Sequence, residues 1–277
     1  MTTYRIDQED ILIKTETNSF YTGKHVVLAH LFDDPVLGFS WKEDGYAMRH
    51  IGGREWYNAL KKDVHRIVRN AVHRVAGRDY LGEGSLIEYH RVVPRQFHKE
   101  VDAIVKRSAL SDFSCSFDCI LEGLAKEGKC SLSFFNRYLK QDHWIIIRIC
   151  PPASTGSRAA NPPHKDIYEE YDQTGSIGRM MNIWIPIENV NVKSSLPVVR
   201  GSHLFPESEI LRTHAGCHID GADYSVNCIE SWHGNREMTR IVPNEGEMLV
   251  FSSHLIHGLA VNMTAGTRVA LELRVHS

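Results

Sequence analysis

The sequence predicts an α+β protein in which N-terminal α-helices flank a single antiparallel β core. Two observations favour this fold class. Apolar residues recur with the helical period before about residue 140, whereas later apolar stretches are short and separated by Gly, Pro and Asn clusters. The 277 residues contain no internal repeat, low-complexity tract or long linker. We therefore expect one domain over residues 1–277, with a mainly helical flanking region over 1–140 and the β core over 141–277.

Three segments before the β core are expected to form helices. Residues 55–76 and 94–110 each place apolar side chains on one stripe, which is the pattern of an amphipathic helix. Residues 116–126 fit a third helix that ends at Gly128. The first fifty residues indicate at most short strands, for example 25–31. A helix with one apolar stripe suits packing against one face of a sheet.

The expected strands of the core all lie after residue 141. Their ranges are 144–150, 181–187, 196–199, 247–251, 258–262 and 268–275. Residues 203–245 form a long polar segment between two of these strands, and we expect it to be a loop. Loops of this length often cover active sites, although most of its histidines are expected to be ordinary loop residues.

Composition excludes several classes of partner. The net charge of −2 provides no basic field for nucleic acid and no polybasic patch for a membrane, so we expect neither partner. The first residues lack the apolar centre of a signal peptide, and no apolar run approaches the ~18 residues of a membrane span. We therefore expect a cytoplasmic protein. Its six cysteines contain no Cys-x-x-Cys pair and are expected to be reduced and mostly buried.

Three pairs of the form His-x-acid are candidates for a metal site, at residues 98–100, 164–166 and 218–220. Chance alone predicts about one such pair in a chain with 16 histidines, so the structural context must decide among them. Residues 98–100 fall inside an expected helix, where side chains two apart point about 200° away from each other. Residues 218–220 lie in a polar loop that no expected strand supports. We therefore discard the first pair and expect the third to be solvated.

His164 and Asp166 have the context that a metal site needs. They follow two prolines and lie between two expected strands, where residues two apart in an extended segment face the same side. His257 is the favoured third ligand, because it begins an expected strand and is followed by Gly258. His254 is the alternative third ligand, although a polar position beside the site suits it better.

The last expected strand brings an arginine to the same place. Arg268 follows the turn at residues 263–267, so His257 and Arg268 are expected to be neighbours in space. Strict alternation turns Arg268, Glu272 and Arg274 away from the apolar layer and towards an interior cavity. A buried arginine costs several kcal/mol unless an anion meets it, and its planar fork suits a carboxylate. We therefore expect the site to bind an acidic cosubstrate.

Two histidines, one carboxylate and an arginine eleven residues beyond the second histidine resemble the 2-His-1-carboxylate triad of non-haem Fe(II), 2-oxoglutarate-dependent oxygenases. More narrowly, the chain resembles the phytanoyl-CoA dioxygenase-like family over about residues 140–277. The resemblance rests on PPHKD at 162–166, NIWIPI at 182–187, LPVVRGSH at 196–203, GEMLVF at 246–251 and the stretch from His257 to Arg268.

The resemblance implies a fold, cofactors and roles. The implied core is a double-stranded β-helix, the jelly roll of cupin-like proteins. His164, Asp166 and His257 would bind Fe(II), and Arg268 would hold the distal carboxylate of 2-oxoglutarate, which reacts with O2 to give succinate and CO2. The carboxylate at Asp166 favours hydroxylation over halogenation. Ala270 departs from the family, which often has a hydroxyl residue there, so the details of cosubstrate binding are expected to differ.

Three further residues are weaker candidates for ligand contacts. Asn182 and Trp184 alternate onto one strand face, which we assign to the cavity, with roles either in cosubstrate contact or in the core. Arg148 is a candidate for an anionic group of the substrate, and a salt bridge at the barrel rim is its alternative. Together with Arg274 and the His-rich segment, it favours a polar small-molecule substrate, of the kind used in specialised metabolism, over a fatty acyl chain.

Two other functions remain open from the sequence. A cupin-like metal-dependent isomerase or dioxygenase that does not use 2-oxoglutarate would share the scaffold and the histidine ligands. Arg268 argues against it, and turnover of 2-oxoglutarate would distinguish the two. A non-catalytic binding protein on the same scaffold is the second alternative, and metal content together with 2-oxoglutarate decarboxylation would separate it from an enzyme.

Overall fold

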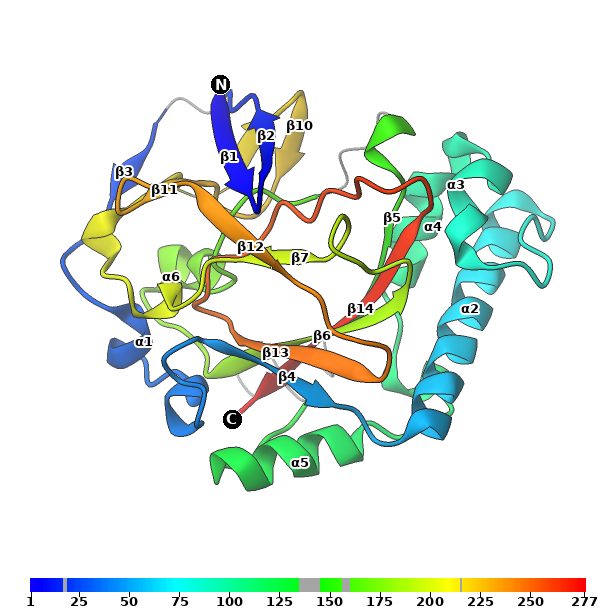
Figure 1. The fold of residues 1–277 in the computed structure, drawn as a ribbon, viewed down its shortest axis with the longest axis horizontal. Coiled ribbons are helices and arrows are strands. Elements are labelled where there is room, and N and C mark those ends of the chain that lie inside the picture. The colour runs from blue at the N-terminus through cyan, green and yellow to red at the C-terminus, as the bar shows by residue number, and fades with distance from the viewer. Residues whose placement is uncertain (17–18, 135–144, 156–159, 215) are drawn as a thin grey trace.

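Two β sheets form the centre of the protein, and helices cover the outer face of the larger sheet (Figure 1). The computed structural model describes residues 1–16, 19–134, 145–155, 160–214 and 216–277. The larger sheet has five antiparallel strands in the order β4-β13-β6-β14-β5. These strands are β4 (Tyr46–His50), β5 (Ile145–Cys150), β6 (Met180–Glu188), β13 (Glu247–Ser252) and β14 (Arg268–His276).

A four-stranded sheet in the order β2-β1-β12-β7 packs against the inner face of the larger sheet. Its strands are β1 (Thr2–Ile6), β2 (Glu9–Ile13), β7 (Leu196–Val198) and β12 (Glu237–Ile241). Two small sheets lie beside it, in the orders β11-β8-β3 and β10-β9. Their strands are β3 (Tyr21–Thr22), β8 (Ile210–Arg212), β9 (Cys217–Ile219), β10 (Ala222–Tyr224) and β11 (Ile229–Trp232).

The helices largely match the expected ones. They are α1 (Leu28–Leu31), α2 (Arg54–Ala76), α3 (Tyr89–Val92), α4 (His98–Val105), α5 (Asp118–Gly128) and α6 (Tyr168–Thr174). Gly77 ends α2 in the left-handed conformation. Helix α4 is shorter than the expected range 94–110, because residues 95–97 form a 3₁₀ turn after Pro94. None of the described helices combines the length and the apolar character that crossing a bilayer requires.

Alternation along the strands of the larger sheet separates two cores. The outward side chains of β6 and β14 pack with α2, α4 and α5. They are Met181, Ile183, Ile185, Ile187, Val269, Leu271, Leu273 and Val275. The inward side chains Trp184 and Ala270 pack against Leu196 and Val198 of β7 in the space between the sheets. The structure therefore confirms the expected α+β fold, a jelly-roll core with flanking helices.

Two expected strands are wrong. Residues 25–31 contain the short helix α1. Residues 258–262 form no strand, although their apolar composition suggested one. Gly258 has φ 137° and Leu259 has φ 48°, so the backbone leaves the extended conformation at both positions. The N–H of Gly258 donates to the carbonyl of Pro197 at 3.2 Å, which holds this irregular segment beside β7.

Residues 203–245 are not one long loop. This segment contains the short strands β8 to β12, and β12 joins the four-stranded sheet between β1 and β7. The first fifty residues also contribute more strands than their sequence indicated, since β1 and β2 lie in the four-stranded sheet and β4 forms an edge of the larger sheet. Strands this short carry almost no periodic signal, so only their partners identify them.

None of the six cysteines, all of which the structure describes, forms a disulfide. Only Cys150 and Cys228 are buried, and Cys119 is exposed. The expectation of reduced thiols therefore agrees with the structure, but the expectation that most are buried is wrong.

Candidate metal centre

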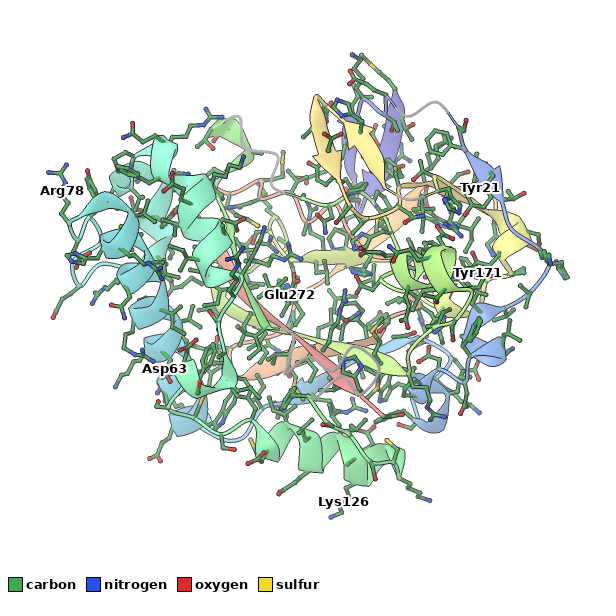
Figure 2. All side chains as sticks on the ribbon, turned by 180° about the vertical axis from the view of Figure 1, so that it is seen from behind. Tyr21, Asp63, Arg78, Lys126, Tyr171 and Glu272 are labelled. Carbon is green, nitrogen blue, oxygen red and sulfur yellow. The ribbon has the colours of Figure 1, made fainter. Side chains whose placement is uncertain are left out.

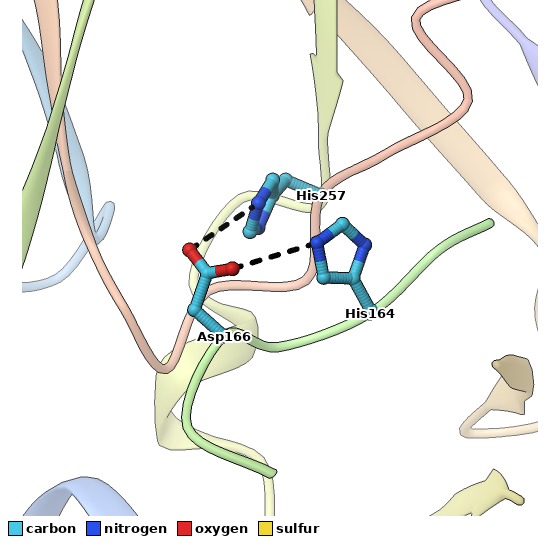
Figure 3. Close-up of side chains that lie close together, drawn as sticks. All are labelled: His164, Asp166 and His257. Carbon is cyan, nitrogen blue, oxygen red and sulfur yellow. Dashed lines mark ion pairs between the residues drawn. The ribbon is translucent and has the colours of Figure 1, made fainter. Parts of the chain in front are cut away.

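His164, Asp166 and His257 lie together at the inner face of the larger sheet (Figure 3). Each offers one ligand atom, and these atoms lie within 4.8 Å of one another. It is the only such group of His, Cys, Asp and Glu side chains among the residues that the structure describes. Two backbone hydrogen bonds join the two histidine segments, since each histidine N–H donates to the other's carbonyl at 2.9 and 3.0 Å.

Each histidine ring is oriented by the backbone carbonyl two residues before it. Nδ1 of His164 lies 2.7 Å from the carbonyl of Pro162, and Nδ1 of His257 lies 3.0 Å from the carbonyl of Leu255. A carbonyl only accepts, so both Nδ1 atoms carry a proton, and in the neutral ring this leaves the Nε2 lone pair for a metal. Burial, followed by the neighbouring His164, lowers the pKa of His257 to about 4. This ring is therefore neutral near pH 7, which is the form that binds a metal.

Asp166 is held as a carboxylate by two side chains of the larger sheet. Asn182 Nδ2 donates to Oδ2 at 2.7 Å, and Arg274 Nη2 lies 2.9 Å from Oδ1. Burial alone would raise the pKa of Asp166. Arg274 and the two histidines lower it by more than burial raises it, so the pKa lies well below its usual range. The His Nε2 atoms lie 3.5 and 3.6 Å from the Asp166 oxygens, too far for good hydrogen bonds.

These donors fit a divalent transition metal. Two imidazole Nε2 atoms and one carboxylate face one point, and their side chains do not satisfy one another by hydrogen bonds. Such a set matches the 2-His-1-carboxylate triad that binds Fe(II) and leaves other coordination positions open. His164, Asp166 and His257 are therefore the residues that would hold the metal.

Arg268 lines the same cavity of about 70 Å³ as the three candidate ligands. Its side chain is only 3% exposed, its guanidinium contacts Cys150 Sγ, and it lies 5.8 Å from the ring centre of Trp184. Its Nε has no hydrogen-bond partner, and no carboxylate among the described residues pairs with it. A buried arginine without an anion is costly, so this position is suited to a carboxylate supplied by a ligand.

Two of the three weaker candidates, Asn182 and Arg148, line the cavity. Asn182 lines it and holds Asp166, whereas Trp184 packs in the inner core beneath Arg268. Arg148 Nε lies 2.9 Å from Glu272 Oε2, which is the rim salt bridge that was the alternative for this arginine. Glu272 lies near the middle of the molecule (Figure 2), and this pair forms one wall of the cavity.

The other histidine candidates lie elsewhere. His254 is buried outside the ligand group, where burial and then Lys165 hold its pKa well below the usual value. His218 does not lie in an unsupported loop, because it belongs to β9 and its ring contacts Glu16 and Asp223 at 2.9 and 2.8 Å. Asp220 accepts the backbone N–H of Lys14 at 3.1 Å. Residues 98–100 lie at the start of α4, as expected.

Two features of the site were missed by the sequence reasoning. Arg274 lines the wider pocket beside the metal cavity, as expected, but its pairing with the candidate ligand Asp166 was not predicted. Lys165, between the two ligands of the HKD motif, is fully buried and pairs with Glu207 at 3.0 Å. The alternation of an extended segment could have indicated that Lys165 points away from the cavity, but not that it is buried there.

Comparisons with known proteins identify a family and a shared fold. The family described as Phytanoyl-CoA dioxygenase (PhyH) matches residues 41–270. No curated protein matches the chain. Among solved structures, the chain is similar to EctD from S. alaskensis with 2-oxoglutarate and 5-hydroxyectoine, at TM-score 0.51 and 16% identity over 96% of this chain and 86% of that chain. This similarity shows a shared fold.

Two further solved structures are similar at lower scores. AviO1 from Streptomyces viridochromogenes Tue57 has TM-score 0.47 and 14% identity, covering 92% of this chain and 97% of that chain. The epimerase SnoN in complex with Fe3+, alpha ketoglutarate and nogalamycin RO has TM-score 0.48 and 14% identity, covering 87% of this chain and 82% of that chain.

Proposed function

The chain belongs to the phytanoyl-CoA dioxygenase family of Fe(II)- and 2-oxoglutarate-dependent oxygenases, and we propose that it hydroxylates a polar small molecule with release of succinate and CO2. In this reaction O2 supplies one oxygen atom to the new hydroxyl group and one to succinate, while 2-oxoglutarate loses CO2. His164, Asp166 and His257 are the proposed iron ligands. Arg268 is the proposed partner of the distal carboxylate of 2-oxoglutarate.

The observation that carries this proposal is the position of Arg268. Its buried guanidinium lines the same cavity as the three ligands and has no carboxylate partner among the described residues. Metal ligands alone would equally suit an enzyme that does not use a 2-oxo acid. An arginine fork facing the metal cavity adds a receptor for a dicarboxylate, and EctD, which shares the fold, was solved with 2-oxoglutarate.

Each residue of the site has a defined task in this chemistry. Bound Fe(II) supplies, with 2-oxoglutarate and O2, the oxidising power for hydroxylation. Asn182 and Arg274 fix the orientation of the Asp166 carboxylate through its two oxygens. The backbone carbonyls behind His164 and His257 fix the tautomers of both rings. The Trp184 ring lies against the Arg268 guanidinium on the inner-core side.

A polar substrate is supported by the space that leads to the cavity. A wider pocket of about 650 Å³ shares Arg148, Asn161 and Asp166 with the metal cavity. It continues to Lys99 on α4 and to Glu169 on α6, so charges of both signs line it. A fatty acyl chain would leave these groups without hydrogen-bond partners, whereas a polar molecule can pair with them.

The test is a turnover assay on the metal-loaded protein. Anaerobic Fe(II) and 2-oxoglutarate are added, followed by O2 and members of a library that contains polar metabolites and acyl thioesters. Succinate formation above the substrate-free rate, with a product 16 mass units heavier, supports the proposal. A protein that binds metal but never consumes 2-oxoglutarate would favour the cupin-like isomerase or the non-catalytic alternative. Coupled turnover of acyl thioesters alone would overturn the polar-substrate part.

A further inference from the structure

Lys165 is a charged residue buried on the far side of the metal-ligand segment. Its side chain is 0% exposed, and that of its partner Glu207 is 3% exposed. His164 and Asp166 line the cavity, whereas Lys165 between them does not and instead contacts Glu207. Nζ of Lys165 lies 3.0 Å from Oε1 of Glu207. The pair therefore lies directly behind the two ligands.

The Lys165 pair continues into a larger buried cluster. Arg212 Nε lies 3.8 Å from Glu207 Oε2, and its two Nη atoms donate to the two oxygens of Asp172 at 2.8 Å each. Asn227 Nδ2 adds a hydrogen bond to Asp172 at 2.7 Å. Two cations and two anions thus form a neutral chain, which we call the Lys165–Asp172 cluster, comprising Lys165, Glu207, Arg212 and Asp172.

This cluster holds the chain on both sides of Asp166. Lys165 directly precedes Asp166, and Asp172 lies on α6, which begins two residues after Asp166. The other members are anchored independently, since the backbone N–H of Glu207 donates to the carbonyl of Val26 at 2.9 Å. The Arg212 guanidinium also packs on the ring of Tyr168 at 3.8 Å, in the first turn of α6. Displacing the backbone at Asp166 would therefore break buried ion pairs.

We propose that Lys165 is a positioning residue for the metal centre, which fixes the HKD segment in the conformation that presents His164 and Asp166 to one ion. An apolar residue at 165 would fill the space but would remove the directional bond to Glu207. An alternative conformation of the segment would then cost less, and the two ligands would be less well preorganised. This inference rests on the metal site of the proposed function.

The test compares Lys165→Met with a matched control. Arg240 is also buried, with its side chain 2% exposed, and it pairs with Asp7 and Glu9 at the four-stranded sheet. Arg240→Met removes a buried cation of comparable burial away from the metal centre. Both variants are expected to lower the urea midpoint. Only Lys165→Met is expected to weaken Mn(II) binding, by tenfold or more, and to change the intensity of the Co(II) visible absorption bands.

Each outcome distinguishes this inference from the proposed function. Equal Mn(II) affinity and an unchanged Co(II) spectrum in Lys165→Met would overturn the positioning role and leave the metal site standing. A wild-type protein that binds neither ion would overturn the proposed function itself. If Lys165→Met does not fold, Glu207→Gln replaces it, because it removes the anion that pairs with Lys165 while keeping the shape of the side chain. This variant is expected to weaken Mn(II) binding several-fold, and an unchanged affinity would overturn the inference.

Discussion

Arg274 and Asn182 are cross-strand partners on β14 and β6, and each binds one oxygen of Asp166. A candidate metal ligand is thus held by a single pair of residues in the larger sheet. The arginine places a permanent cation 2.9 Å from the carboxylate, which counteracts the effect of burial on its pKa. The register of β6 with β14 therefore sets both the orientation and the protonation of Asp166.

Replacing Arg274 is expected to make metal binding more sensitive to acid. Burial raises the pKa of Asp166, and Arg274 is the foremost influence that lowers it. In Arg274→Met the carboxylate pKa rises, so protons compete with the metal at higher pH than in the wild type. Co(II) titrations between pH 5 and 8 measure this shift. Identical pH profiles of the two proteins would show that Arg274 does not set the protonation of the ligand.

Single alanine variants are expected to identify the third ligand. His257→Ala should weaken Mn(II) binding by at least tenfold, because a two-ligand site loses both affinity and geometry. His254→Ala and His218→Ala should bind Mn(II) like the wild type, since neither ring belongs to the ligand group. Isothermal titration measures all three affinities. Loss of binding in His254→Ala with full binding in His257→Ala would reverse the assignment.

Arg268 variants are expected to separate cosubstrate binding from metal binding. Removing one partner of a buried, bidentate ion pair costs about 2 to 5 kcal/mol, so Arg268→Ala should weaken 2-oxoglutarate affinity by tens-fold or more. Arg268→Lys keeps the charge but loses the fork, and its affinity should be intermediate. Mn(II) binding without 2-oxoglutarate serves as the control and should change little. An unchanged 2-oxoglutarate affinity in Arg268→Ala would place the cosubstrate elsewhere.

The close approach of the Pro162 carbonyl explains why a glycine, Gly258, follows the third ligand. Its φ is 137°, and a Cβ there would lie 2.3 Å from the carbonyl oxygen of Pro162, just before His164. Gly258→Ala should therefore displace the HKD segment, lower the unfolding free energy by about 2 kcal/mol or more, and weaken Mn(II) binding. Gly123→Ala in α5 is the control, because a Cβ there meets nothing within 4 Å. Normal Mn(II) binding in Gly258→Ala would contradict the close packing.

The arrangement of the site was partly predictable because it depends on local alternation. The period of two along residues 268–275 turned Arg268 and Glu272 towards the cavity, and the structure places both there. The same period placed Asn182 and Trp184 on one face of β6. Such inferences need only the direction of side chains within one strand, which the sequence contains.

Relationships between strands were not predictable in this way. The pairing of Arg274 with Asp166 depends on the register of β14 with β6, which long-range packing determines. Residues 258–262 looked like a strand because their composition is apolar. The φ angles of Gly258 and Leu259, which prevent a strand, are not visible in the sequence. The burial of Lys165 likewise depends on Glu207, which lies 42 residues away.

Buried histidines are expected to make the metal-free protein less stable in acid. Burial lowers the pKa of His203, His257 and His276 to about 4, and that of His254 well below its usual value. In the unfolded chain each has a pKa of about 6.5, so between about pH 6.5 and 4 the unfolded state binds protons that the folded state does not. The unfolding free energy therefore falls as the pH falls through this window. Asp34 acts in the opposite sense, because its pKa is raised to about 6 and the folded state holds its proton.

The size of this effect follows from the number of protons. Each proton that only one of the two states binds changes the unfolding free energy by about 1.4 kcal/mol per pH unit, so four histidines offset by one carboxyl give a slope of roughly 4 kcal/mol per unit near pH 5. Urea unfolding of chelator-treated protein at pH 5, 6 and 8 measures this slope. His254→Gln should reduce it by about one proton, since glutamine does not titrate. A slope that His254→Gln leaves unchanged would mean that His254 is protonated in the folded protein, and that the nearby Lys165 cation does not hold it neutral.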